Sequence, residues 1–368
     1  MCVSTSALPS VEYDDINPGM GTLNKEPKSK GTSKRGIHFN PGDVLFGKLR
    51  PYLKNWLFAC FEGVAVGDFW VLTSSKIDHG FTYSLIQAPE FQYIANLSSG
   101  SKMPRSDWGL VSNARTFIPT NLSEQKSISS VLFGLDTAIT LHEEKKRQLE
   151  CLKSALLQKM FADENGYPAV RFRGFDEAWK QCKLGDVGQT YTGLSGKSKE
   201  DFGHGKARFV TYMNIYSNPV SDLNMVEPIE IDERQNEVQY GDAFFTTSSE
   251  TPEEVGMASV WTGDEKHTYL NSFCFGYRPI SKINPYYLAY MLNSQSLRRK
   301  IVILAQGISR YNISKKSVME IPASLPSAEE QNRIGLIFKD LDQSITLYEH
   351  KLELLKRLKS SLLQNMFI

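Results

Sequence analysis

One stretch of the chain occurs twice, 206 positions apart. Residues 135–161 align with residues 341–367 without a gap, and 16 of the 27 aligned positions are identical. Two unrelated helical segments of similar composition would agree at about one position in ten. The chain therefore contains a duplicated module, and its two halves have to be interpreted together.

Both copies carry the signals of a long helix. Asn121 and Ser327 stand at equivalent positions as N-caps, and each is followed three residues later by a glutamate, Glu124 or Glu330. This spacing predicts a capping box, in which the two side chains satisfy backbone N–H groups reciprocally. At about 1.5 Å per residue, such helices are roughly 60 Å long. The predicted helices are residues 121–161 and 327–368.

Each predicted helix bears one apolar stripe in alternating steps of four and three, the spacing of a coiled coil. The two copies break this rhythm at the same place, which favours packing of the helices on each other as an antiparallel pair. The alternative, in which each helix lies on its own domain, stays open. The predicted interface consists of Ile128, Leu132, Leu135, Ile139, Leu149, Leu152 and Leu156 in the first helix, and of Ile334, Phe338, Leu341, Ile345, Leu352, Leu355, Leu358 and Leu362 in the second.

The segments before the two helices, residues 1–120 and 162–326, are typical of mixed α/β (α+β) domains. In the second, apolar runs at 208–213, 243–247 and 258–261 predict strands, and 285–299 predicts a helix. The first has a similar outline, with Gly42-Asp43 matching Gly241-Asp242 and a helical stretch near 81–95. The region before Gly42 is 38 residues shorter than its counterpart, so we expect the first domain to be truncated at its N-terminus; a naturally short domain is the alternative.

Composition excludes several classes of protein. No apolar run approaches the ~20 residues of a membrane span, so a cytoplasmic protein is expected. Five scattered cysteines without a C-x-x-C pair predict neither a disulfide framework nor a metal site. The formal net charge is only +1, so a polyanion would have to bind local patches, such as the cations between Arg298 and Lys316. Such a run is also compatible with an ordinary solvated surface.

Two motifs resemble catalytic sites but are incomplete. Gly196-Lys197-Ser198 lacks the glycine that a phosphate-binding loop requires five positions earlier, where Tyr191 stands. Asn284-Pro285-Tyr286-Tyr287 lacks the second proline of an adenine methyltransferase box, so a proline in the first turn of a helix is the better interpretation. The sequence predicts no catalytic residue, no metal ligand and no bound cofactor.

The doubled motif resembles one known family. Each long helix is preceded by Ile-Pro (118–119 and 321–322), contains Glu-Gln (124–125 and 330–331) and ends in Leu-Leu-Gln-x-Met-Phe; the segment 171–185 also looks like the start of a target-recognition domain. These features are similar to those of the DNA specificity (S) subunit of type I restriction-modification systems. The resemblance covers nearly the whole chain, and the shortened first domain is its one departure.

The resemblance implies a non-catalytic subunit that reads a bipartite site in double-stranded DNA. Each recognition domain would read one half-site, and the helices would act as spacers. The implied partners are type I methyltransferase (M) subunits, two of them expected, and restriction (R) subunits bound through the M complex. S-adenosylmethionine, ATP and Mg²⁺ would belong to those partners only. The alternative is a truncated or silent specificity cassette that acts as a coiled-coil adaptor without reading DNA.

Base reading requires polar side chains on loops that enter the major groove, with phosphate contacts around them. An ordinary surface role stays open for each candidate. The candidates are Lys48, Arg50, Lys102 and Arg105 in the first domain, and Thr192, Ser195, Lys197, Lys199, Thr247, Ser248, Arg310, Tyr311 and Asn312 in the second.

Overall fold

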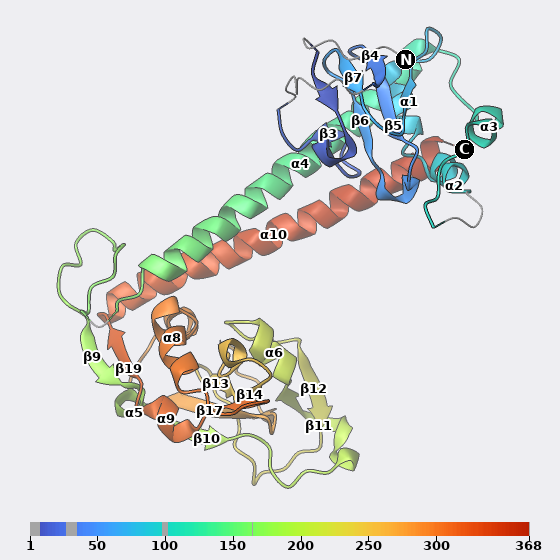
Figure 1. The fold of residues 1–368 in the computed structure, drawn as a ribbon. Coiled ribbons are helices and arrows are strands. Elements are labelled where there is room, and N and C mark those ends of the chain that lie inside the picture. Colours follow the sequence, from blue (N-terminus) through green and yellow to red (C-terminus); the bar gives the residue numbers. More distant parts are fainter. Residues whose placement is uncertain (1–7, 27–34, 98–101, 164, 368) are drawn as a thin grey trace. The chain divides into compact units, whose positions relative to one another are not determined.

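A computed structural model describes residues 8–26, 35–97, 102–163 and 165–367 (Figure 1). The chain divides into two compact units, one formed by residues 1–145 with 348–368 and the other by residues 146–347. Each unit thus combines a mixed α/β domain with part of both long helices, and each is treated by itself below. Within the described residues, no helix combines the length and apolar character needed to cross a bilayer.

The first unit contains two three-stranded sheets and a short hairpin. The sheets have the orders β1-β7-β4 and β6-β5-β8, and β2 pairs with β3. The strands are β1 (Ser10–Val11), β2 (Ile16–Asn17), β3 (Thr22–Leu23), β4 (Ile37–Phe39), β5 (Val44–Gly47), β6 (Trp56–Phe58), β7 (Gly63–Ala65) and β8 (Phe69–Leu72). The helices of this domain are α1 (His79–Leu85), α2 (Pro89–Ala95) and α3 (Trp108–Asn113), with 3-10 turns η1 (Tyr13–Asp15) and η2 (Pro51–Leu53).

The second unit is built around an antiparallel sheet of order β10-β17-β13-β15, beside a sheet of order β12-β11-β16 and the pairs β14-β18 and β19-β9. Its strands are β9 (Lys180–Lys183), β10 (Gly188–Thr192), β11 (Phe202–Val210), β12 (Val226–Ile229), β13 (Ala243–Thr246), β14 (Ser248–Ser249), β15 (Ala258–Val260), β16 (Thr268–Leu270), β17 (Cys274–Pro279), β18 (Tyr311–Asn312) and β19 (Pro322–Leu325). Its helices are α5 (Leu184–Val187), α6 (Tyr212–Ser217), α7 (Pro285–Leu292), α8 (Gln295–Ile303) and α9 (Lys315–Met319), with 3-10 turns η3 (Lys199–Asp201) and η4 (Pro252–Glu254).

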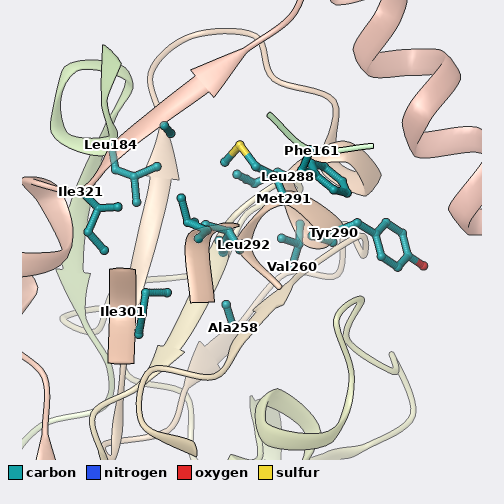
Figure 2. Close-up of a cluster of buried hydrophobic side chains, with 14 of the residues drawn as sticks. Phe161, Leu184, Ala258, Val260, Leu288, Tyr290, Met291, Leu292, Ile301 and Ile321 are labelled. Carbon is teal, nitrogen blue, oxygen red and sulfur yellow. The ribbon is translucent and has the colours of Figure 1, made fainter. Parts of the chain in front are cut away.

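The largest core forms where α7 and α8 cover the four-stranded sheet. Alternation along β13 assigns its side chains to two faces: Ala243 and Phe245 join the core beneath α7, whereas Phe244 packs in a second cluster on the opposite face. Figure 2 shows residues of the larger core, among them Val260 of the sheet and Leu288 of α7. This core anchors the strands whose ends carry the candidate site.

The first domain repeats this arrangement in smaller form. Along β5, Val44 and Phe46 pack with α1 and α2 side chains, whereas Leu45 belongs to the cluster on the other face. Just before β5 and β13, Gly42 and Gly241 both adopt positive φ, 95° and 86°, which favours glycine. The next residue in each copy is a buried aspartate whose carboxylate accepts a backbone N–H three residues earlier. The two domains are therefore structural relatives.

The two long helices are confirmed. They are α4 (Leu122–Lys159) and α10 (Ala328–Met366), and Asn121 and Ser327 directly precede them. Gln125 and Gln331 perform the same task in each copy: their amide oxygens accept the backbone N–H of Asp78 and Asn284, the N-caps of α1 and α7. Their amide nitrogens donate to the Pro119 and Pro326 carbonyls. Each long helix is thereby joined at its start to the domain that precedes it.

The antiparallel packing of α4 with α10 is visible in the contacts of both units. In the first unit, Leu132 near the start of α4 shares a buried cluster with Leu363 near the end of α10 and Phe367 just after it. In the second unit, Phe161 just after α4 stacks on Phe338 near the start of α10, with ring centroids 5.8 Å apart. This confirms the predicted fold class of two mixed α/β domains with an antiparallel helix pair.

Two predicted interface residues lie outside the buried stripe. Leu152 and Leu358 are 48% and 49% exposed. At the break in the apolar rhythm, the stripe passes instead through Lys153 and Lys359, which form ion pairs with Asp342 and Asp136 of the opposite helix. Of the other predicted positions, Leu132, Ile139, Ile334, Phe338, Leu341 and Leu352 are buried, and Ile128, Leu135, Leu149, Leu156, Ile345, Leu355 and Leu362 are half-buried.

Several local predictions were wrong. The strand expected over 208–213 ends at Val210, and Tyr212 begins α6 because the Thr211 side chain caps it. The helix expected over 285–299 is two helices, separated where Ser294 caps α8. The proline at 285 does occupy the first turn of a helix, as expected.

The capping boxes are also incomplete. Asn121 accepts from the N–H of Ser123, and the Glu330 side chain bonds Arg171 and Trp179 instead of reaching back to Ser327. The truncation of the first domain stays a prediction.

Candidate nucleic-acid interface

In the second domain, the ends of three neighbouring strands lie at the same end of the four-stranded sheet. β10 ends at Thr192, opposite Phe275, and β13 ends at Thr246, opposite Cys274, the first residue of β17. Because both neighbours run antiparallel to β17, the loops that follow β10 and β13 emerge beside the loop that precedes β17. The candidate residues Thr192 and Thr247 therefore lie at the same end of the domain.

A first group of candidates gathers around the β14-β18 pair. Ser248 and Ser249 pair with Asn312 and Tyr311, and the Ile313 N–H donates to the Thr247 carbonyl at 3.0 Å. Residues some 60 positions apart are thus joined through their backbones. Arg310 directly precedes this pair and is exposed. The members of this group, called the β14-β18 group below, are Thr247, Ser248, Arg310, Tyr311 and Asn312.

Burial raises the pKa of a tyrosine beside the β14-β18 group. The Tyr212 hydroxyl donates to the Ser248 carbonyl at 3.1 Å. Burial is the main cause of the raised pKa of Tyr212, and the neighbouring Cys274 thiol is the second cause. The phenol therefore stays protonated at neutral pH and serves as a hydrogen-bond donor that supports β14.

The other four candidates of this domain lie at or after the end of β10; they are Thr192, Ser195, Lys197 and Lys199. Asn236 donates to the Thr192 carbonyl at 3.2 Å, and Gln235 bonds both backbone groups of Ser195. Lys199, in η3, is exposed. These bonds hold the loop after β10 against the 232–236 turn, which sequence reasoning did not include.

Lys197 differs from the other candidates because its charge is already paired. Its ammonium lies 3.0 Å from the Asp232 carboxylate, and its side chain is only 10% exposed. Hydrogen bonds from Arg234 and, to a smaller extent, from Lys197 hold the pKa of the Asp232 carboxyl well below its usual range. Lys197 thus serves to brace the loop, and the exposed Lys199 is the better placed of the two cations.

The first domain brings its four candidates together in the same way. Arg105 and Lys48 both face Asp68, at 2.9 Å and 3.8 Å. The Arg50 N–H donates to the Pro104 carbonyl at 2.7 Å, so the loop after β5 runs beside the segment that contains Lys102. Lys48, Arg50, Lys102 and Arg105 therefore form a basic surface on two neighbouring loops, and two of them pair with Asp68, which sequence reasoning missed.

Tyr13 organises the interior of this basic surface. Its hydroxyl donates to the Asp68 carbonyl at 2.6 Å and accepts the Leu49 N–H at 3.2 Å. Burial raises the pKa of Tyr13 to about 12, so the phenol remains protonated and keeps its donor. Arg50 itself adopts a left-handed conformation, with φ of 50°, just before Pro51. The loop is thus fixed from within, while the Arg50 side chain is exposed.

Part of the predicted basic run is structural. Arg298 donates to the carbonyls of Glu253, Val255 and Gly256, and Lys300 donates to the Pro322 carbonyl. Burial lowers the pKa of Arg298. Its guanidinium joins α8 to η4 and is not available to a polyanion. Arg310 remains as the exposed cation of the β14-β18 group.

Both sites consist of loops carrying hydrogen-bond donors, acceptors and cations. In the parts of the chain that the structure describes, no group of three or more His, Cys, Asp or Glu side chains is arranged to hold a metal ion. Side chains of this kind can bind phosphates and read base edges.

Comparison with known proteins supports this interpretation. Residues 176–357 match the family described as "Type I restriction modification DNA specificity domain". Two proteins of Methanocaldococcus jannaschii are related to the chain. The putative type I restriction enzyme MjaX specificity subunit is 22% identical over 220 residues, which are 58% of this chain and only 50% of that protein. The type I restriction enzyme MjaVIII specificity subunit is 20% identical over 356 residues, 88% of this chain and 75% of that protein.

Solved structures share the fold along most of the chain. The HsdS subunit from Thermoanaerobacter tengcongensis has a TM-score of 0.50 at 20% identity, covering 97% of this chain and 89% of that one. The type I restriction-modification system S subunit from M. genitalium has a TM-score of 0.53 at 16% identity, covering 100% and 90%. A chain from a study of complex assembly and conformational transition in the type I R-M system has a TM-score of 0.53 at 18% identity, covering 97% and 90%.

These matches agree with the doubled motif, the duplicated domain frame and the antiparallel helix pair. Residues 176–357 therefore belong to the family of type I restriction-modification DNA specificity domains, and the chain as a whole shares the fold of solved specificity subunits.

Proposed function

We propose that this chain reads a bipartite sequence in double-stranded DNA and itself carries out no chemistry. Each α/β domain would contact one half-site through the loops at its strand ends. The helix pair would act as the spacer between them, since two half-sites lie on one face of B-DNA only when they are in register with its helical turn of about 34–36 Å.

The observation that carries this proposal is the equivalence of the two polar surfaces. Candidates chosen from sequence alone lie after the equivalent strand of each domain, Lys48 after β5 beside Asp68 and Thr247 after β13 beside Phe273. Unrelated surface residues would have no reason to coincide in this way. Two reading surfaces on one chain suit a split site.

The proposed partners are inferred from the similarity to this family. We propose that two type I methyltransferase subunits dock on the chain and that restriction subunits join through them. S-adenosylmethionine, ATP and Mg²⁺ would be bound by those partners. Purified chain mixed with S-adenosylmethionine and target DNA should transfer no methyl group until the methyltransferase subunit is added. Transfer by the chain alone would contradict the non-catalytic assignment.

Salt dependence provides the test of DNA binding. A protein that contacts 6–10 phosphates loses about 10³–10⁵ in affinity between 50 and 200 mM salt, because binding releases condensed counterions. We expect a decrease of this order for the chain with its methyltransferase subunit, measured by fluorescence anisotropy on duplex DNA. Replacing Arg105 and Arg310 with Ala should reduce the slope. Affinity that does not change with salt would support the alternative, an adaptor without DNA reading.

A further inference from the structure

The two domains hold one loop position in the same backbone frame. In the first domain, Lys48 follows β5 and its N–H donates to the carbonyl of Asp68, the residue before β8, at 2.9 Å. In the second, Thr247 follows β13 and its N–H donates to the carbonyl of Phe273, the residue before β17, at 3.2 Å. Asp68 and Phe273 therefore occupy equivalent places at the tip of the reading surface.

The side chains at this place differ completely between the domains. Asp68 is an acceptor that faces Lys48 and Arg105. Phe273 is a ring that is 66% exposed. Conserving the frame while exchanging a carboxylate for an aromatic ring is the pattern expected of a position that distinguishes two DNA half-sites.

The backbone of Phe273 is held by hydrogen bonds although its ring faces solvent. Its N–H donates to the Asn271 side-chain oxygen at 2.9 Å, and its carbonyl also accepts the Thr247 hydroxyl at 2.7 Å. Asn271 is itself buried, and its amide nitrogen donates to the Val210 carbonyl at 3.0 Å. An exposed ring adds little to the folded core, so this bracing points to a role in contact with another molecule.

The neighbours of Phe273 are the candidate reading residues. On one side, the chain after Thr192 runs beside residues 270–271, where the Leu194 N–H donates to the Leu270 carbonyl at 2.8 Å. On the other side lies Thr247 of the β14-β18 group. Phe273 thus lies between the two polar groups of the second domain and would meet the same DNA groove.

We propose that Phe273 reads a thymine in the half-site of the second domain by contact with the 5-methyl group of that base. This inference rests on the proposed function. The ring offers no strong hydrogen-bond donor or acceptor. The thymine methyl is the apolar group that a base pair presents in the major groove, and phenylalanine is among the side chains that contact it. The polar residues beside it would read the neighbouring base edges.

The experiment uses the full chain in complex with its methyltransferase subunit. The preferred duplex is first selected from a randomised pool. Each thymine of that duplex is then replaced singly by deoxyuridine, which removes the methyl group and leaves base pairing unchanged. For the wild-type complex, we expect one substitution in one half-site to weaken binding about 5- to 100-fold, the range of a lost base contact.

The variant Phe273→Ala should bind the thymine and deoxyuridine duplexes equally at that position. Tyr240→Ala is the matched control, because Tyr240 is a 59% exposed aromatic residue before the opposite end of β13. This control should keep the sensitivity of the wild type. Since both side chains are exposed, equal thermal midpoints would show that both variants fold.

Three outcomes would overturn the inference about Phe273: no deoxyuridine substitution weakens the wild type, the selected half-sites contain no thymine, or Phe273→Ala keeps the wild-type sensitivity. None of them contradicts the proposed function, because the wild-type complex has then still selected a sequence. Failure of the selection itself, with no sequence enriched by the wild type, would instead contradict the proposed function.

Discussion

At the scale of single residues, the clearest difference between the two copies concerns a glutamate of the shared Glu-Gln motif. Glu330 is fully buried and forms a bidentate pair with Arg171, at 2.7 and 2.8 Å, while accepting the Trp179 indole N–H at 3.1 Å. Its counterpart Glu124 is exposed. One residue of the repeat therefore holds the start of the second domain in place, and the other makes no comparable buried contact.

Replacing Glu330 with Ala should destabilise the second unit strongly. The change leaves the Arg171 guanidinium, 15% exposed, without its carboxylate, and removing one member of a buried pair costs about 3–5 kcal/mol. Glu124→Ala is the matched control, with an expected effect within about 0.5 kcal/mol. The measurement is the midpoint of urea unfolding, followed by tryptophan fluorescence. Equal midpoints for the two variants would show that the buried pair contributes little.

At the scale of elements, the break in the apolar rhythm determines which leucines of α10 are buried. Leu363 is 8% exposed and packs with Phe81, Leu132 and Phe367, whereas Leu358 is 49% exposed. Lys359 takes the place in the stripe that the regular pattern would give to an apolar side chain, because it reaches Asp136 on α4.

Leu363→Ala should therefore cost about 2–5 kcal/mol, the usual range for removing a buried leucine. Leu358→Ala, five residues away on the same helix, should cost about 0.5 kcal/mol. Because the chain has two units, hydrogen exchange of α10 is a better measure than a single global transition. A larger loss of protection in Leu358→Ala would show that the leucine stripe of the sequence pattern is correct after all.

The sequence was informative where two copies could be compared. The doubled pattern predicted both long helices and their mutual packing, and it placed candidate reading residues after corresponding strands. It did not predict Asp68 or Phe273, since a lone aspartate or phenylalanine before a short strand carries no local signal. It also assigned Leu358 to the helix interface and left out Leu363, because heptad spacing cannot show that a lysine with a carboxylate partner enters an apolar stripe.

At the scale of the whole molecule, the charge pattern favours one orientation of the two similar helices. α4 carries Asp136 and Lys153, and α10 carries their counterparts Asp342 and Lys359. In a parallel pair with equivalent residues opposite each other, aspartate would face aspartate and lysine would face lysine. In the observed antiparallel pair, Lys359 lies 2.5 Å from Asp136 and Lys153 pairs with Asp342. The duplicated charges thus favour the antiparallel arrangement and oppose the parallel one.

Exchanging the charges of one helix should make both contacts repulsive. We expect Asp136→Lys combined with Lys153→Asp in α4 to lower the thermal midpoint. Adding Asp342→Lys and Lys359→Asp in α10 should restore part of the loss, with a coupling of about 0.5–3 kcal/mol for each pair. Restoration stays incomplete because Asp342 also accepts a hydrogen bond from Tyr290, which a lysine cannot replace.

The exposed pair Glu353 and Arg357, both on α10, supplies the control. Exchanging these two residues should change the midpoint little, since surface pairs within one helix contribute about 0.3–0.5 kcal/mol. If the fourfold exchange is no more stable than the exchange in α4 alone, the cross-helix pairs do not determine the orientation. The apolar contacts of Leu132, Phe338 and Leu363 would then have to determine it by shape alone.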